Sequence, residues 1–190
     1  MNSLKGQILI ASPGLLDPNF VRTVVLIAEH NEEGALGLVL NRPAETKVAE
    51  LWAALSDEPT DSESLAFVGG PVQKNAVLLL HGHADLAPGT DPIIPGVYLA
   101  SEVDILGQLL ARESSLKAAG GGAFRVFCGY SGWGAGQLDG EMKAGGWLTS
   151  PAAAEHVFQE APERLWTSAM RSLGGVYEFF SMMPQNPEMN

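Results

Sequence analysis

The chain has 190 residues, of which 46% are hydrophobic and 17% charged, a balance that predicts one folded domain and excludes an intrinsically disordered chain. Its 22 acidic side chains outnumber 11 basic ones and give a formal net charge of −11, so direct nucleic-acid binding, which needs clustered Lys and Arg, is not expected. The single cysteine, Cys128, cannot form a disulfide within the chain, no export signal is visible, and no apolar run reaches the ~20 residues of a membrane-spanning helix. These features predict a cytoplasmic protein that does not enter the membrane.

The first half of the chain is predicted to form short strands separated by turn residues. Residues 7–11 predict a strand that ends at Pro13, and residues 23–28 and 35–40 predict a hairpin across a polar turn. Residues 65–68 and 76–81 predict two buried strands, with a sharp turn at residues 69–71 between them. A helix is predicted where apolar residues recur at helical spacing, at Val48, Leu51, Trp52 and Leu55.

The second half contains the longer predicted helices. An irregular stretch at residues 83–95 precedes a helix that begins at the S-x-x-D pattern of Ser101 and Asp104 and runs to about residue 114. Its buried face is predicted to consist of Val103, Leu106 and Leu110. Glycines at 120–122 lead to a strand at residues 124–128, then to a glycine-rich loop and a helix that begins near Gln137. Helix starts are predicted at residues 150–151 and 161–162, and a helix end at residues 173–174. Strands outnumber helices without strict alternation, so we predict an α+β single domain over residues 1–183 with a frayed tail at residues 184–190.

The glycine-rich segment from Gly129 to Gly136 has the most unusual composition. Backbone amides between a strand and a helix can cradle an anion, but the spacing G-x-x-G-x-G-x-G matches neither a dinucleotide fingerprint nor a P-loop. Ser131 lies near the position of the nucleophile in G-x-S-x-G, yet Trp133 replaces the closing glycine. The alternative is that the glycines allow tight turning and close packing beneath Tyr130 and Trp133.

Histidines and carboxylates supply the other candidates for chemistry. His81, His83 and Asp85 alternate along the chain and would face one way in an extended segment, as metal ligands do. Ordinary loop histidines explain this pattern better, and no metal or cofactor is predicted. His30, at the end of a strand, and Glu141, on the helix after the glycine-rich loop, are the candidate general bases.

Several spaced sequence blocks occur together along the chain. They are Gly6-x-x-Leu9-Ile10-Ala11-Ser12-Pro13, Asp17-x-x-Phe20-x-x-Thr23-Val24-Val25, Glu29-His30, Gly34-Ala35-x-Gly37-Leu38-Val39-Leu40-Asn41-Arg42-Pro43, Gly69-Gly70-Pro71-Val72, Leu80-His81, Gly129-Tyr130-Ser131-Gly132-Trp133-Gly134-x-Gly136-Gln137-Leu138-x-x-Glu141 and Trp147-Leu148. In this order they resemble the motifs of the YqgE/AlgH family, from about residue 6 to residue 177. The chain departs from that pattern at Ser131, where the family commonly has alanine, and at Asp139, where it commonly has glutamate.

The resemblance implies an α+β fold in which a bifurcated, partly barrel-like β-sheet is surrounded by helices. It implies no established enzymatic activity, and the regulatory name of the family reflects an association with alginate gene expression in some bacteria. His83, Asp85 and Cys128 are not motif positions of the family. The candidate residues that do coincide with its motifs are Asp17, His30, Asn41, Arg42, His81, Tyr130, Trp133, Gln137 and Glu141.

Two functional hypotheses follow. The preferred one is an intracellular binding or regulatory protein, with any effect on transcription indirect, that binds an unknown small molecule or protein partner. Its cleft would lie between residues 12–22, the corner at residues 41–43 and the loop from Gly129 to Gln137. The alternative is a small-molecule hydrolase with a cleft at the same loop, His30 or Glu141 as the base, and loop amides that stabilise negative charge. The predicted cleft residues are Asp17, Arg22, His30, Asn41, Arg42, His81, Tyr130, Trp133, Gln137 and Glu141.

Overall fold

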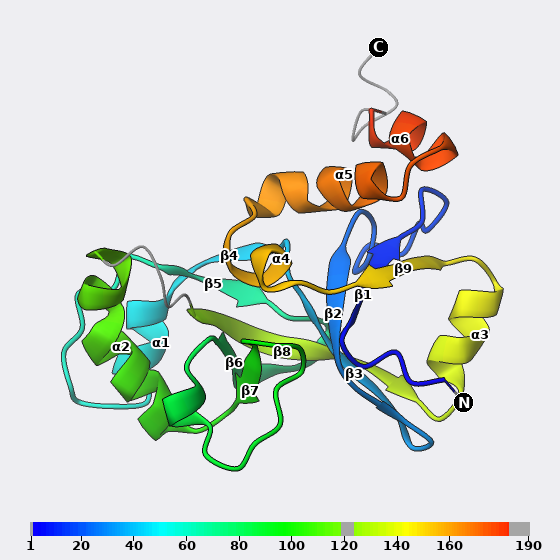
Figure 1. Cartoon of the computed structure of the whole chain (residues 1–190). Helices are drawn as coiled ribbons and strands as arrows, with labels where there is room; N and C mark the ends of the chain where they lie inside the picture. The colour runs from blue at the N-terminus through cyan, green and yellow to red at the C-terminus, as the bar shows by residue number, and fades with distance from the viewer. Residues whose placement is uncertain (1, 119–123, 183–190) are drawn as a thin grey trace.

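A large mixed β-sheet with helices packed against it forms the protein (Figure 1). The computed structural model describes residues 2–118 and 124–182. Within them the main path of the sheet runs β4-β5-β8-β3-β2-β1-β9, and β6 pairs with both β7 and β8 beside this path. The path ends at β4 on one side and at β9 on the other, so the sheet is open, and the predicted α+β class is confirmed.

The elements follow one another along the chain without a repeating βα order. The strands are β1 (Gln7–Ala11), β2 (Val24–Asn31), β3 (Gly34–Val39), β4 (Pro43–Lys47), β5 (Leu65–Val68), β6 (Val72–His81), β7 (Tyr98–Ala100), β8 (Phe124–Gly134) and β9 (Trp147–Pro151). The helices are α1 (Val48–Ala53), α2 (Val103–Ala118), α3 (Gln137–Lys143), α4 (Ala154–Phe158), α5 (Pro162–Ser172) and α6 (Val176–Ser181), with a 3-10 turn η1 (Ala84–Leu86).

The sheet forks along its longest strand, β8. The first half of β8 pairs with β5 in parallel and with β6 in antiparallel orientation, and its second half pairs with β3. Gly69, just after β5, donates its N–H to Cys128 O, and its own carbonyl accepts from Val39 N. The segment that leaves β5 therefore lies between β8 and β3. The predicted bifurcation of the sheet is therefore present, and it begins at the middle of β8.

Glycines make the fork possible because the chain must cross β8 to pass from β5 to β6. Gly70 has φ +156°, and a Cβ on it would collide with the backbone carbonyl of Tyr130 and the backbone nitrogen of Ser131. A Cβ on Gly129 would lie 2.7 Å from Val72 O. Since only glycine lets two backbones approach so closely, Gly69, Gly70 and Gly129 serve one crossing.

Both faces of the central strands are buried, which explains their continuous apolar runs. On one face Ile8, Val24 and Phe127 pack beneath α5, which crosses above β1 and β2 (Figure 1). The other face has two separate clusters, one under α1 and α2 at one end of the sheet, and one under α3 at the opposite end (Figure 1). Alternate residues of one strand therefore belong to different clusters, as with Leu9 under α3 and Ile8 under α5.

Most predicted elements are confirmed. The strands at residues 7–11 and 65–68, the hairpin formed by β2 and β3, and the helices α1, α2 and α3 occur where the sequence predicts them. α5 begins with Pro162 in its first turn and ends before Gly174 at φ +69°, as predicted from proline and glycine placement.

Four sequence predictions are wrong. Residues 129–134 continue β8 and form no loop, because glycines here permit backbone crossing inside a sheet. Pro151 ends the edge strand β9 and starts no helix, since an edge strand tolerates a residue without an N–H. The buried stripes predicted for the first two helices are narrower than expected, because Leu55 lies beyond α1 and is 43% exposed, and Val103 at the start of α2 is 40% exposed.

Two further predictions concern residues outside the described ranges, namely the glycine break at residues 120–122 and the frayed tail at residues 184–190. Within residues 2–118 and 124–182, no helix combines the length and apolar character needed to cross a bilayer.

Candidate functional site

Three aromatic rings meet where the loop at residues 12–22 faces α3 and β9. Phe20 stacks on Trp133 with ring centroids 6.0 Å apart and meets Trp147 edge-on at 5.3 Å. The two indoles are themselves T-shaped at 6.2 Å. Trp133 and Trp147 are buried and Phe20 is half-buried, so this cluster forms an apolar floor below the surface.

One carboxylate holds both indoles. Glu141 Oε2 accepts hydrogen bonds from Trp133 Nε1 and from Trp147 Nε1, each at 2.9 Å. Its Oε1 accepts from Gln137 Nε2 at 3.0 Å, and Gln137 Oε1 in turn accepts from Gly134 N at 3.1 Å. Residues four apart share a face of a helix, so Gln137 and Glu141 on α3 reach the end of β8 together. Glu141 is thus a positioning residue that fixes the aromatic floor.

A cleft of about 670 Å³ opens above this floor. Its volume lies within the range of small-molecule sites. Its polar side chains include the carboxylates of Asp17 and Glu141, and no Lys or Arg is among the described residues that line it. The lining residues are Ser12, Gly14, Leu15, Asp17, Asn19, Phe20, Pro71, Gly132, Trp133, Gln137, Glu141, Ala144, Gly145, Gly146 and Trp147. We call this space the α3 cleft.

Asn41 anchors the end of the loop at residues 12–22. Its Oδ1 accepts from Val24 N at 2.9 Å, and its Nδ2 donates to Arg22 O at 2.9 Å. Both side-chain polar atoms are therefore used to hold the loop against β2, which makes Asn41 a structural residue.

Arg42 holds the same loop from outside. Its Nη2 donates to Pro18 O at 3.0 Å and to Val21 O at 3.3 Å. Burial lowers the pKa of Arg42 from its ordinary value, and the charge of Asp17 opposes this shift. The interaction links Arg42 electrostatically to the rim of the α3 cleft.

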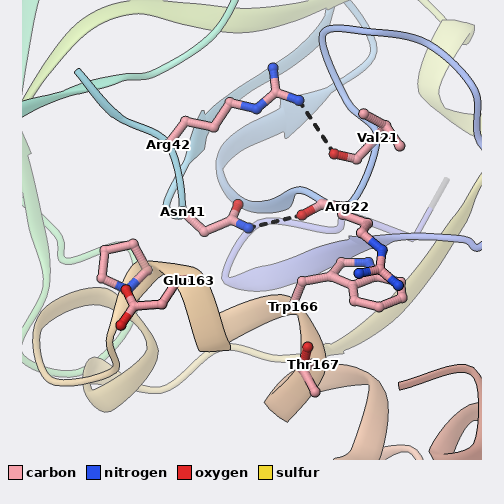
Figure 2. A pocket seen from close by; sticks show the side chains of 8 residues that line it. Val21, Arg22, Asn41, Arg42, Glu163, Trp166 and Thr167 are labelled. Atoms are coloured by element: carbon pink, nitrogen blue, oxygen red, sulfur yellow. Dashed lines mark hydrogen bonds between the residues drawn. The ribbon is translucent and has the colours of Figure 1, made fainter. Parts of the chain in front are cut away.

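The structure divides the predicted cleft residues between two hollows. Asp17, Trp133, Gln137 and Glu141 line the α3 cleft. Arg22, Asn41 and Arg42 line a second pocket of about 240 Å³, on the other side of the loop (Figure 2). The loop at residues 12–22 contributes a wall to each of them.

His30 and Tyr130 lie outside both hollows. His30 is buried at the far end of β2, where its Nδ1 accepts from Leu4 N at 3.0 Å and its carbonyl accepts from Ser3 Oγ. Tyr130 is half-buried and packs against the cluster beneath α5. Both side chains have packing roles in the positions the structure gives them.

His81 is buried at the end of β6, where it pairs with Phe124 at the start of β8, whereas α3 follows the opposite end of β8. Its ring stacks on Tyr98 at 5.7 Å and on His83 at 6.4 Å, and its Nδ1 accepts from His83 N. Its Nε2 is buried and has no hydrogen-bond partner among the described residues. Asp85 pairs with Arg112, and no cluster of three His, Cys, Asp or Glu side chains suited to a metal ion occurs in residues 2–118 and 124–182.

The stability of the protein is expected to depend on pH through His81. Burial and, to a smaller degree, the nearby His83 lower the pKa of His81 below its ordinary 6.5, whereas Asp85 and Glu102 oppose the shift. The contribution of neutral His81 to the free energy of unfolding is fully present above pH 6.5. It is lost as the pH falls from 6.5 toward the lowered pKa, because His81 then binds a proton in the unfolded chain but not in the folded chain.

Urea unfolding at a series of pH values measures this effect. The free energy of unfolding should fall by at most ~1.4 kcal/mol per pH unit in that window. In His81→Phe, which keeps an aromatic ring in the stack, the part of this pH dependence that comes from His81 should disappear. A difference between the two proteins that stays constant with pH would contradict this assignment.

The candidate groups of a hydrolase are dispersed. Ser131 is buried, and its Oγ donates to Gly69 O at 3.1 Å inside the fork. Glu141 lines the α3 cleft, whereas His30 is not among its lining residues. The amides of residues 129–134 belong to a strand, and Gln137, the first residue of α3, lies only three residues beyond Gly134. The arrangement offers an apolar floor and an acidic rim for binding.

Phe20 and Trp147 are the aromatic residues of the α3 cleft that are not among the cleft residues named from the sequence, although the predicted wall at residues 12–22 contains Phe20. Phe20 is an aromatic residue in a loop that also contains prolines and glycine, and an aromatic residue in such a loop is a signal for a ligand contact. Trp147 follows α3 in the sequence, as Trp133 precedes it. The T-shaped contact between Trp133 and Trp147 could not be predicted from their spacing alone.

Comparison with known proteins agrees with the fold and with the motif blocks. The model of the family described as AlgH-like matches residues 8–178. A UPF0301 protein of Chlorobaculum tepidum is 42% identical over 187 residues, which are 97% of this chain and 95% of that relative. A UPF0301 protein of Chlamydia caviae is 35% identical over 187 residues, which are 98% and 95% of the two chains.

Solved structures show the same architecture. The solution structure of the AlgH protein from Pseudomonas aeruginosa is similar with a TM-score of 0.74 and 31% identity, over 97% of this chain and 96% of that chain. A crystal structure of protein DIP2367 from Corynebacterium diphtheriae has a TM-score of 0.72 at 24% identity, over 96% and 93%, which shows a likeness of fold. The chain therefore belongs to the AlgH-like family.

Proposed function

We propose that this protein is a non-enzymatic binding protein of the cytoplasm and that the α3 cleft holds a small organic cation with an apolar body. The observation that carries the proposal is the lining of the cleft: two carboxylates, no basic side chain, and an aromatic floor. Regulation would then follow from occupancy of the cleft, and any effect on transcription would be indirect.

Electrostatics favours a cation over an anion in this cleft. Asp17 is exposed at the rim, where its Oδ1 also accepts from Asn19 N at 2.7 Å. Glu141 adds a second negative charge at the floor, and the chain as a whole has a formal charge of −11. A negative potential focused in a cleft raises the local concentration of cations and speeds their association.

The aromatic floor favours an apolar or methylated ligand body. Indole faces attract cations such as substituted ammonium groups, and the attraction grows when water is displaced. Because Glu141 fixes both indoles, the floor is rigid before a ligand arrives, which reduces the ordering cost of binding.

The amino-acid composition supports a cytoplasmic location and an indirect effect on transcription. One cysteine and a strongly acidic surface suit a reducing compartment, and an excess of acidic residues does not favour binding to phosphate backbones. A protein partner that recognises the occupied cleft is the route we expect from ligand to regulation.

Thermal stability in the presence of candidate ligands tests the proposal. A ligand that binds only the folded state raises the melting temperature, so amines should raise it more than nucleotides, phosphosugars or simple carboxylates. Asp17→Asn keeps an Oδ1 acceptor for the turn but removes the charge, and should weaken amine binding about fivefold, since a partly exposed charge contributes ~1 kcal/mol.

Asp139→Asn is the matched control, because Asp139 lies on α3 but does not line the α3 cleft. It makes the same change in net charge and should leave amine binding nearly unchanged. Equal weakening by the two variants would reduce the effect to the overall charge of the protein, and preferential stabilisation by anions would overturn the proposal.

A further inference from the structure

The polar groups at the floor of the α3 cleft are hydrogen-bonded to one another. The indole N–H groups of Trp133 and Trp147 both donate to Glu141 Oε2 at 2.9 Å. Glu141 Oε1 accepts from Gln137 Nε2 at 3.0 Å, and Gln137 Oε1 accepts from Gly134 N at 3.1 Å. A ligand that rests on the floor therefore meets a negative charge whose oxygens already have partners.

The floor has little capacity to accept further hydrogen bonds. An ionised carboxylate has roughly four lone-pair sites, and Glu141 already accepts from two indoles and from Gln137. The indole N–H is a donor only, and the ring of Phe20 has no polar atom. Glu141 is half-buried, so the protein shields its oxygens in part from water. About one acceptor site is left beside the three rings of the floor.

The other side-chain acceptors of the cleft belong to the loop at residues 12–22. They are the oxygens of Ser12, Asp17 and Asn19. Asp17 and Asn19 are exposed, and Asp17 Oδ1 already accepts from Asn19 N at 2.7 Å. Because water competes for exposed acceptors, a ligand gains little net free energy from hydrogen bonds at these two residues. The loop contributes charge, and the floor decides which head group is bound.

This distribution separates two kinds of organic cation. A primary ammonium carries three N–H donors, and burying it on the floor leaves donors without acceptors, which is costly. A quaternary ammonium has no N–H group and loses no hydrogen bond when it leaves water. Its charge is attracted by Glu141 and by aromatic faces, and its methyl groups pack on the rings.

From this arrangement we infer that the α3 cleft binds fully alkylated ammonium groups and discriminates against primary ammonium groups. The inference rests on the proposed function, because it names the class of cation that the same cleft holds. Selectivity comes from the shortage of free acceptors at the floor, since both classes carry the same charge.

NMR titration with choline and with ethanolamine tests the inference. Both molecules are cations with a hydroxyethyl chain at pH 7, and they differ in three methyl groups. The reporters are the indole N–H signals of Trp133 and Trp147, which lie in the floor. We expect choline to bind about tenfold more tightly than ethanolamine, the equivalent of about one unsatisfied donor.

Gln137→Met separates the hydrogen-bond effect from the apolar contact of the methyl groups. The variant keeps the length of the side chain but removes the donor to Glu141 Oε1, so this oxygen becomes free for an ammonium N–H. Gln137 is exposed and methionine is a good helix former, so the variant should fold. Ethanolamine should bind about fivefold more tightly to it than to the unchanged protein, whereas the affinity for choline should change less than about twofold.

Gln108→Met is the matched control, because Gln108 is exposed on α2 and does not line the α3 cleft. It should leave both affinities unchanged. Equal binding of choline and ethanolamine, or the same choline preference in Gln137→Met as in the unchanged protein, would overturn the inference. The proposed function would survive either result if both cations bind more tightly than the neutral 3,3-dimethylbutan-1-ol. If neither cation does so, the proposed function fails, and the inference fails with it.

Discussion

Replacing Gly70 by alanine is expected to lower the free energy of unfolding by ~3 kcal/mol or more and to leave little folded protein. Gly70 crosses β8 with φ +156°, and a Cβ would collide with backbone atoms of Tyr130 and Ser131, which cannot rotate away. Overpacking costs about 1 to 3 kcal/mol, and a backbone conformation unsuited to an L side chain adds a similar amount. Chemical denaturation of the purified variant, or its loss from the soluble fraction, measures the effect.

Gly140→Ala is the matched control for this prediction. Gly140 lies inside α3, and a Cβ on it would have no neighbour within 4 Å. Alanine there should raise the free energy of unfolding by ~0.5 to 1 kcal/mol, because it restricts the unfolded chain and favours the helix. A folded and fully stable Gly70→Ala would show that the crossing at the fork is looser than the structure indicates.

Glu141→Ala is expected to lower the free energy of unfolding by ~2 to 3 kcal/mol and to abolish ligand binding in the α3 cleft. The substitution leaves the Nε1–H groups of Trp133 and Trp147 without their acceptor and frees Gln137. A hydrogen bond to a charged group contributes about 1.5 to 3 kcal/mol, and water that enters the open cleft replaces part of the loss.

Two variants separate the geometry of the network from its charge. Glu141→Gln retains a carbonyl oxygen that can accept from the indoles, so it should cost only ~1 kcal/mol and keep both indole N–H signals near their original NMR positions. Glu45→Ala, on the exposed edge strand β4, should change stability by less than ~0.5 kcal/mol. If Glu141→Ala leaves both indole signals and the stability unchanged, the network does not hold the floor.

The fold could be predicted from sequence where local signals and packing agree. β1, β5 and the β2–β3 hairpin are apolar runs bounded by turn residues, and α5 has proline at its start and glycine after its end. β4 has no such signal, because the polar residues of Pro43–Lys47 pair at an edge of the sheet with β5. The three-residue strand β7 has no such sequence signal either, because it forms by pairing with the end of β6.

The glycine-rich segment shows why a local pattern misleads when the cause is distant. Six of its residues read as a loop between a strand and a helix, yet they lie in β8. Gly129 is the glycine that the crossing requires, because a Cβ on it would lie 2.9 Å from Gly70 O, about sixty residues earlier in the chain, and one sequence does not reveal that two segments cross.

The candidate site could be predicted in part. Asp17, Trp133, Gln137 and Glu141 come from three separate segments of the chain and line one cleft, in which the i, i+4 spacing on α3 brings the last two together. Arg22, Asn41 and Arg42 were expected in the same cleft but lie across the loop, because the path of residues 17–22 depends on the hydrogen bonds of Asn41 and Arg42. His30 and His81 are buried in the sheet, and no periodicity distinguishes a buried histidine from an accessible one.

The most direct test of the account compares choline with its neutral isostere 3,3-dimethylbutan-1-ol in the same NMR titration. The two molecules have nearly the same shape and differ in charge, so their difference isolates the attraction of the acidic rim and the aromatic floor. If the α3 cleft binds cations, choline shifts the indole N–H signals of Trp133 and Trp147 saturably while the signal of Trp166 stays in place, and the alcohol binds at least tenfold more weakly, a difference of about 1.4 kcal/mol. Equal shifts with both molecules, or choline shifts confined to Trp166, would contradict a cation-binding α3 cleft.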